Sequence, residues 1–359
     1  MNLLRVAIAF AAAGASTACA TTYALVPSPQ PTLAIVGSGS PESSSAIQHT
    51  IGSDRWTTTT ANGSGTVPVF DSAPLAGAHP ALTRVVLIVH GETRDAGQYY
   101  DDVETGAKAT GSTVTALVVA PQFLNTADVQ DRKNALPATI LGWHVDQYSD
   151  GDDAQTPAAI SAFDVLDALV TSFTNRASYP ALTTIVLAGH SGGAQLMQRY
   201  AVIGHAHAAA RAAGYDVRFV IASPSSFLYF DEERPRLKGG FKPGGRNCPT
   251  FDDWRFGLKA PPRYVGTPSA TTLWAAYTGL AVTYISGADD VDPHGSIDQS
   301  CMAEEQGATR VARASNYLAY LAHRYGKPWP QPLITVLGVG HSDQQMLTSQ
   351  QAEKALFGP

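Results

Sequence analysis

The feature that most constrains this chain is a serine between glycines, at the junction of a predicted strand and a predicted helix. Residues 184–188 (TIVLA) are apolar and β-branched, which is typical of a strand buried on both faces. They run directly into 189–193 (GHSGG), and an alanine-rich helical pattern continues over 192–213. Glycines at 189 and 193 leave room for a sharp turn that lifts the Ser191 hydroxyl clear of the sheet. We therefore expect Ser191 to be a nucleophile; the alternative is a glycine-rich turn with a surface serine.

A serine nucleophile needs a base, and in this strand–turn–helix arrangement the base follows a later strand. His341 comes shortly after the predicted strand 333–337 (LITVL). The carboxyl ends of parallel strands meet at one edge of a sheet, so His341 is the expected general base. The alternative is a loop histidine that caps a helix beginning near Ser342.

The base needs an acid to orient it, and three aspartates compete for that role. Asp289, Asp290 and Asp292 all follow the predicted strand 281–286 (AVTYIS). Asp290 lies three residues after a glycine and three before a proline, and we favour it on this spacing. Asp292 is the second choice and Asp289 the third, and we expect the two that are not used to cap turns within the loop.

Acyl transfer also needs two backbone N–H donors for a developing oxyanion. The amide of Gly192, directly after the serine, is one candidate. The second should come from the loop after the predicted strand 84–89 (RVVLIV), where we favour the amide of Glu92, with Gly91 as the alternative. His90 is expected to support this loop by hydrogen bonding and not to act as a second base.

Strands and helices alternate along the body of the chain, which predicts a mainly parallel sheet with helices on both faces. A hairpin is predicted at 55–60 and 66–70, and Pro68 would make its second strand an edge strand. The other predicted strands are 84–89, 113–120, 184–188, 217–222, 281–286 and 333–337. The predicted helices are 157–175, 192–213 and 302–325.

One long segment, 224–275, breaks this rhythm and is rich in Pro, Gly, Arg and aromatic residues. So long an irregular segment rarely lacks a use, so we expect a cap or lid over the site. Phe227 and Tyr229 in this region, Trp143 in an earlier loop, and His190 are possible substrate-lining residues. The alternative for such aromatic side chains is ordinary packing.

The residues named so far resemble the α/β-hydrolase superfamily. The matching positions are the His90-Gly91 loop, the motif 189–193, Asp290 and His341, in the family's order, and the resemblance covers about residues 54–357. It implies an α/β fold with an eight-stranded, mostly parallel sheet, no metal or cofactor, and hydrolysis through an acyl-enzyme. The segment 223–235 also resembles a secreted, poorly characterised group, which implies no substrate.

Carboxylic esters, small or polymeric, are the substrates we favour for such a site. The same three residues would also suit an amidase or peptidase, and a non-catalytic surface-binding relative of the fold is the alternative from another class. A net charge of −6 and a pI near 5.9 argue against nucleic-acid binding, which needs a basic face.

The N-terminal residues 1–20 have the pattern of a signal peptide. Arg5 precedes an apolar run, and Ala18-Cys19-Ala20 fits a cleavage site; Cys19 could instead receive lipid, although Ser16 departs from the usual lipoprotein pattern. Residues 21–49 are rich in Pro and Ser and are expected to be a flexible linker before a hydrolase domain at 50–359. We expect export to a periplasmic or extracellular location, with possible membrane anchoring through Cys19.

The cysteine count agrees with export. Once Cys19 is lipidated or removed, Cys248 and Cys301 remain, an even number in an oxidising compartment. We predict a disulfide between them; the alternative is two separate buried thiols.

Overall fold

The computed structural model describes residues 49–145, 147–267 and 269–359. The predicted signal segment, Cys19 and residues 21–48 of the predicted linker lie outside the described residues. Within the described ranges, every helix is too short or too polar for a transmembrane segment.

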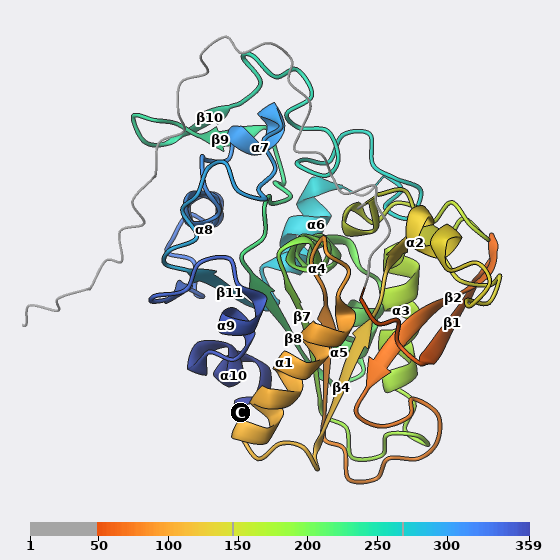
Figure 1. The fold of residues 1–359 in the computed structure, drawn as a ribbon. Helices are drawn as coiled ribbons and strands as arrows, with labels where there is room; N and C mark the ends of the chain where they lie inside the picture. Colours follow the sequence, from red (N-terminus) through yellow and green to blue (C-terminus); the bar gives the residue numbers. More distant parts are fainter. Residues whose placement is uncertain (1–48, 146, 268) are drawn as a thin grey trace, which may run out of the picture.

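An eight-stranded sheet forms the centre of the protein, in the order β1-β2-β4-β3-β7-β8-β11-β12 (Figure 1). β1 pairs antiparallel with β2 and β2 pairs antiparallel with β4, whereas all other neighbours are parallel. The strands are β1 (Asp54–Thr60), β2 (Gly63–Asp71), β3 (Arg84–Val89), β4 (Ala116–Pro121), β7 (Thr184–His190), β8 (Asp216–Ala222), β11 (Ala281–Gly287) and β12 (Leu333–Val336). The predicted eight-stranded, mostly parallel sheet is confirmed.

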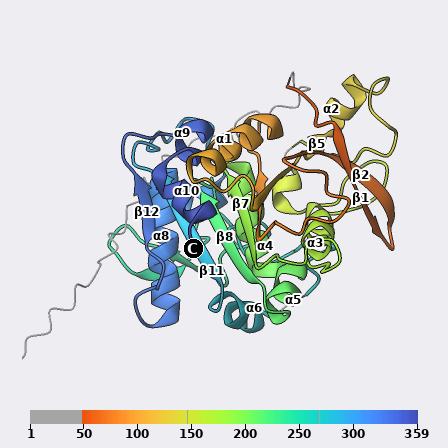
Figure 2. The same cartoon turned by 90° about the horizontal axis from the view of Figure 1, so that it is seen from below.

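Helices cover both faces of the sheet, as Figure 2 shows from below. One face carries α1 (Ala96–Ala109), α9 (Asp343–Leu347) and α10 (Gln350–Phe357). The other carries α3 (Ala162–Phe173), α4 (Gly192–Ile203), α5 (Ala206–Ala212) and α8 (Arg310–Tyr325). Side chains of β3 alternate between the two: Val86 and Ile88 belong to the first core, Val85 and Leu87 to the second.

Two of the predicted helices are interrupted. The pattern over 192–213 forms α4 and α5, separated at Gly204, whose backbone approaches the Tyr200 ring so closely that a Cβ atom would lie 2.5 Å from it. The pattern over 302–325 forms α7 (Cys301–Glu304) and α8, separated by a turn at Gly307 with φ 146°. α3 begins later than predicted because Ser161 caps it, in a reciprocal capping box with Asp164.

The prediction that Pro68 marks an edge strand is wrong, because β2 lies between β1 and β4. The pairing of β2 with β4 covers only Val69–Asp71, so Pro68 lies just outside it. Its carbonyl oxygen accepts a hydrogen bond from the backbone N–H of Gln122 at 2.8 Å. Proline has no N–H to return the second bond of this pair, so the ladder between β2 and β4 begins only at Val69.

The segment 224–275 connects β8 to β11 and contains β9 (Glu233–Pro235), β10 (Phe241–Pro243) and α6 (Ala270–Tyr277). A disulfide joins Cys248 in this segment to Cys301 at the start of α7, with the two Cα atoms 5.8 Å apart. The predicted pairing is therefore confirmed. A lid function for the segment stays a prediction. Between β4 and α3 the chain forms β5 (Leu124–Asn125), α2 (Thr126–Asp131), β6 (Gly142–Trp143) and the short 3-10 helix η1 (Gln147–Asp150).

Candidate active site

Ser191 occupies a sharp turn between β7 and α4. Its φ of 57° lies in the left-handed region, which is uncommon for a residue with a side chain. The turn depends on its glycines. At position 193 a Cβ atom would lie 2.1 Å from the Val89 carbonyl oxygen, and at position 189 a Cβ atom would lie 2.3 Å from the Gly193 carbonyl oxygen. The Ser191 side chain therefore stands at the N-terminus of α4, where backbone N–H groups favour a developing negative charge.

Three side chains from distant parts of the chain meet at this turn. The His341 Nε2 atom lies 2.9 Å from Ser191 Oγ, and His341 Nδ1 lies 2.8 Å from Asp290 Oδ2. Because an ionised carboxylate can only accept, the Nδ1 atom donates to Asp290, and Nε2 is left to accept from the serine hydroxyl. Ser342, not His341, caps α9.

The structure also separates Asp290 from the two competing aspartates. Asp290 is buried, whereas Asp289 and Asp292 are exposed. The backbone N–H of Asp289 bonds to the Val339 carbonyl at 2.9 Å, and the Asp292 carboxylate accepts from the backbone N–H of His294 at 2.8 Å. These two aspartates therefore shape the loop, and the structure brings only Asp290 to His341.

Arg310, the first residue of α8, lies behind this pair. Its Nη1 atom is 3.5 Å from Asp290 Oδ1, and its Nη2 atom donates to the backbone carbonyl of Ser296. Burial alone would raise the pKa of Asp290, but the hydrogen bond and charge of His341 and the charge of Arg310 outweigh it and lower the pKa below its ordinary value. Burial also lowers the pKa of His341 below 6.5, and the Arg310 charge adds to this while the hydrogen bond to Asp290 opposes it. The imidazole is thus neutral, and able to accept a proton, at pH 7.

The loop after β3 runs beside the serine. A Cβ atom at Gly91 would lie 3.2 Å from Ser191 Cβ and 3.5 Å from Ser191 Oγ. One at Gly192 would lie 3.5 Å from the amide nitrogen of Glu92. The backbone atoms of Gly192 and Glu92 are therefore close neighbours next to Ser191.

His90 and Tyr148 hold the carbonyl of Gly91 in place. The backbone N–H of Phe123 donates to His90 Nε2 at 2.9 Å, so His90 carries its proton on Nδ1, which donates to the Gly91 carbonyl at 2.9 Å. Tyr148 donates its hydroxyl to the same carbonyl at 2.9 Å. In a trans peptide the carbonyl and the next N–H point in opposite directions, so these contacts also fix the Glu92 N–H. Burial lowers the pKa of His90 to about 4, consistent with the supporting role expected for it.

His190 lies beneath the site and not on an open surface. It is 1% exposed, its Nδ1 atom is 3.0 Å from the Tyr99 hydroxyl, and its ring centroid is 4.7 Å from that of His341. Burial, followed by the charges of His341 and Arg310, lowers its pKa well below 6.5. A neutral ring therefore supports the base from below.

The other possible substrate-lining side chains are interior as well. Trp143 is fully buried and donates its indole N–H to the Asp152 carbonyl at 3.0 Å. Phe227 stacks on Tyr317 with ring centroids 4.5 Å apart, and Tyr229 meets the same ring edge-on at 5.2 Å. The structure thus places these residues in packing positions. The sequence could not separate the two roles, because the interior and an apolar pocket demand the same kind of side chain.

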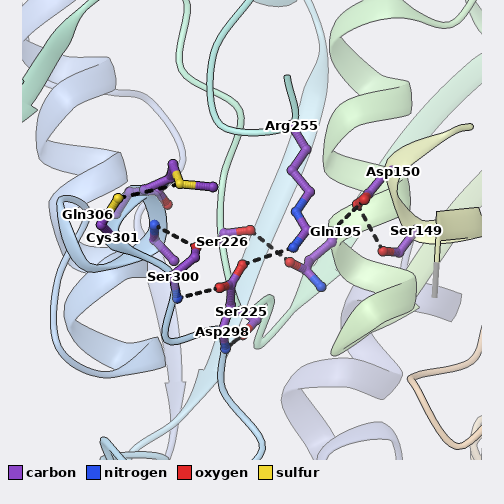
Figure 3. A network of polar contacts seen from close by, with 12 residues as sticks. Ser149, Asp150, Gln195, Ser225, Ser226, Arg255, Asp298, Ser300, Cys301 and Gln306 are labelled. Carbon is purple, nitrogen blue, oxygen red and sulfur yellow. Dashed lines mark hydrogen bonds and ion pairs between the residues drawn. The ribbon is translucent and has the colours of Figure 1, made fainter. Parts of the chain in front are cut away.

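A polar network near the site was not anticipated from the sequence (Figure 3). Arg255, in the segment 224–275, pairs with Asp150 of η1 at 2.5 Å and with Asp298 of the loop after Asp290 at 3.3 Å. The backbone N–H of Asp298 donates to the Ser225 hydroxyl at 2.7 Å. One guanidinium thus joins three segments that follow different strands.

The network continues onto the helix that carries the nucleophile. Gln195, one turn after Ser191 on α4, accepts a hydrogen bond from the Ser226 hydroxyl at 2.8 Å. Arg199, a further turn along, lies 3.1 Å from the same hydroxyl and pairs with Asp150 at 3.2 Å. Among the described residues, no three His, Cys, Asp or Glu side chains gather in a way that could hold a metal ion.

Comparison with known proteins gives structural matches only. The sequence matches no protein-family model and no curated protein. Poly(aspartic acid) hydrolase-1 from Sphingomonas sp. KT-1 superposes with a TM-score of 0.57 and 21% identity, over 86% of this chain and 99% of that one. LpqC, a poly(3-hydroxybutyrate) depolymerase from Bordetella parapertussis, gives a TM-score of 0.57 and 19% identity over 86% and 91%. Together with the strand order and the serine turn, these matches show that the chain has the α/β-hydrolase fold.

Proposed function

We propose that this protein is a serine hydrolase that cleaves carboxylic esters through an acyl-enzyme. The observation that carries the proposal is the continuous relay from Asp290 Oδ2 to His341 Nδ1 at 2.8 Å and from His341 Nε2 to Ser191 Oγ at 2.9 Å. A relay of this kind on a strained strand–helix turn is what nucleophilic serine chemistry requires.

In the proposed mechanism Ser191 Oγ attacks the substrate carbonyl carbon while His341 Nε2 takes the hydroxyl proton. The amides of Gly192 and Glu92 stabilise the resulting oxyanion, with Gly91 as the alternative donor for the second position. His341 then gives the proton to the leaving alcohol as the carbon–oxygen bond breaks. Water hydrolyses the acyl-enzyme by the same steps, and Asp290 holds the imidazole in the required tautomer throughout.

Polymers are included in the proposed substrate class. The two structural relatives are named for a polyester, poly(3-hydroxybutyrate), and for a polyamide, poly(aspartic acid). The second name supports amide hydrolysis as the alternative activity of the same residues. A non-catalytic binding protein is the remaining alternative, and it has no use for a serine–histidine–aspartate relay.

The test is hydrolysis of chromogenic esters from acetate to palmitate, with poly(3-hydroxybutyrate) and poly(aspartic acid) in parallel, by residues 21–359 and by the Ser191→Ala variant. Ester turnover that is lost in the variant supports the proposal. Turnover of the polyamide alone would replace it with the amidase alternative. No turnover of any substrate, with Ser191 inert to serine reagents, would reject both.

We also propose that the protein is exported, on the signal-like pattern of residues 1–20 and on the disulfide between Cys248 and Cys301, which requires an oxidising compartment. Lipid attachment at Cys19 would anchor it to a membrane. Metabolic labelling with a palmitate analogue tests this directly: incorporation that Cys19→Ser removes supports anchoring, and a released, unlabelled protein that starts near residue 21 contradicts it.

A further inference from the structure

The position of Arg310 in the fold is energetically unfavourable for a charged side chain. It is 2% exposed, so its guanidinium is removed from water, and its Nε atom has no hydrogen-bond partner among the described residues. It is also the first residue of α8, where the helix dipole disfavours a positive charge. Apolar packing alone would favour a methionine or leucine here, so the arginine needs another explanation.

The contacts of Arg310 supply that explanation. One arm of the guanidinium pairs with Asp290 Oδ1 at 3.5 Å, and the other donates to the Ser296 carbonyl, six residues further along the same loop. The second Asp290 oxygen is the one that contacts His341 Nδ1, at 2.8 Å. The planar fork of an arginine can hold a carboxylate and a loop carbonyl at once, which a lysine cannot do with the same geometry.

We propose that Arg310 is a positioning residue for the base: it fixes one oxygen of Asp290 so that the other faces His341, and it keeps a positive charge beside the imidazole. This inference rests on the proposed function. The positive charge discourages protonation of His341, so the base stays available as the pH falls. The fixed carboxylate keeps Nε2 directed at Ser191.

Other charged groups around the pair come from several elements. Asp343 at the start of α9 acts on His341 in the opposite direction to Arg310, and the ring of His190 at the end of β7 lies tilted against that of His341. Glu92 of the β3 loop and Tyr99 of α1 act on Arg310 itself. A substitution at position 310 leaves all of these residues in place. His190 also feels the Arg310 charge, but burial is the main cause of its lowered pKa, so a change in the pH profile reports on the arginine.

The experiment measures the rate at which a p-nitrophenyl alkylphosphonate modifies Ser191 as a function of pH. The serine oxygen bonds to phosphorus, p-nitrophenolate leaves, and His341 takes the serine proton, so the rate follows the neutral imidazole without knowledge of the natural substrate. Arg310→Met removes both the positive charge and the planar guanidinium, and Arg310→Lys keeps the charge alone. Arg313→Met is the matched control: Arg313 is equally buried on the same helix but donates to the carbonyls of Ser225 and Gly307.

We expect the midpoint of the acid limb to rise in Arg310→Met and to stay in place in Arg313→Met and Arg310→Lys, with a lower plateau rate in Arg310→Lys. Each pH unit by which the midpoint rises lowers the labelling rate on the acid limb about tenfold. Melting curves identify any variant that does not fold. An unchanged midpoint in folded Arg310→Met, or a wild-type rate at every pH in Arg310→Lys, would overturn the inference. A wild-type protein that the reagent leaves unmodified would instead reject the proposed function.

Discussion

Gly91 lies in contact with Ser191, although 100 residues separate them in the sequence. A Cβ atom at position 91 would come within 3.2 Å of Ser191 Cβ, 3.5 Å of Ser191 Oγ and 2.8 Å of the Tyr99 hydroxyl. A side chain at residue 91 would therefore push the β3 loop away from the serine or displace the Tyr99 hydroxyl. This contact makes the loop and the serine turn one structural unit.

Gly91→Ala should lower kcat/KM by about 100-fold, the cost of losing one oxyanion donor, because the new methyl group pushes the Glu92 amide away from the serine. Ester hydrolysis is the measurement. Gly279→Ala is a suitable control, since a Cβ atom there would meet nothing closer than 3.6 Å. Equal activity of Gly91→Ala and the control would show that the loop contributes no donor.

Gly193→Ala should destabilise the protein as well as inactivate it. A Cβ atom would lie 2.1 Å from the Val89 carbonyl oxygen, and backbone atoms of a central strand cannot move aside. We expect the free energy of unfolding to fall by about 1–3 kcal/mol, the usual cost of overpacking. Urea denaturation measures it, and a variant as stable as the wild type would contradict the described turn.

The dependence of kcat/KM on pH should have an acid limb with its midpoint below 6.5. Burial and the charge of Arg310 lower the pKa of His341, and the base works only when neutral. Activity is therefore retained from neutral pH down through 6.5 and is lost as the pH falls through the lowered pKa. A midpoint above 6.5 would mean that the Asp290 charge outweighs burial.

The disulfide should stabilise the fold by constraining the unfolded chain. Cys248 and Cys301 are 53 residues apart, and the loop-entropy relation gives a contribution of about 4 kcal/mol. Cys248→Ser and Cys301→Ser should each lower the free energy of unfolding by up to this amount, and reducing agent should then have no further effect on either. Wild-type protein whose stability is unaffected by reduction would contradict the prediction.

Much of the fold and the central residues could be predicted because they depend on local patterns. The runs at 84–89 and 184–188 read as buried strands, and a parallel sheet gathers whatever follows its strand ends, which placed Asp290 and His341 near Ser191. The spacing that favoured Asp290 over Asp289 and Asp292 agrees with the loop in the structure, where only Asp290 turns inward.

The residues that sequence reasoning missed act through long-range contacts. Arg310 meets Asp290, and Arg255 meets Asp150 and Asp298, across separations that no motif encodes. One signal was available: Arg310 and Arg313 lie on the same face of α8 as the buried Tyr317, so two arginines interrupt an apolar stripe. The aromatic residues expected to line a substrate site, such as Phe227, lie in packing positions, the alternative that the sequence left open. Sequence alone could not separate the two, because core and pocket select the same side chains.

Covalent labelling is the decisive experiment for Ser191 as the nucleophile of a hydrolytic site. The protein is treated with a p-nitrophenyl alkylphosphonate, digested, and analysed by mass spectrometry, beside the Ser191→Ala and His341→Ala variants. We expect one adduct, on Ser191, which is absent from Ser191→Ala and forms far more slowly in His341→Ala. An unmodified Ser191, or an adduct on another residue that forms equally fast in all three proteins, would contradict it.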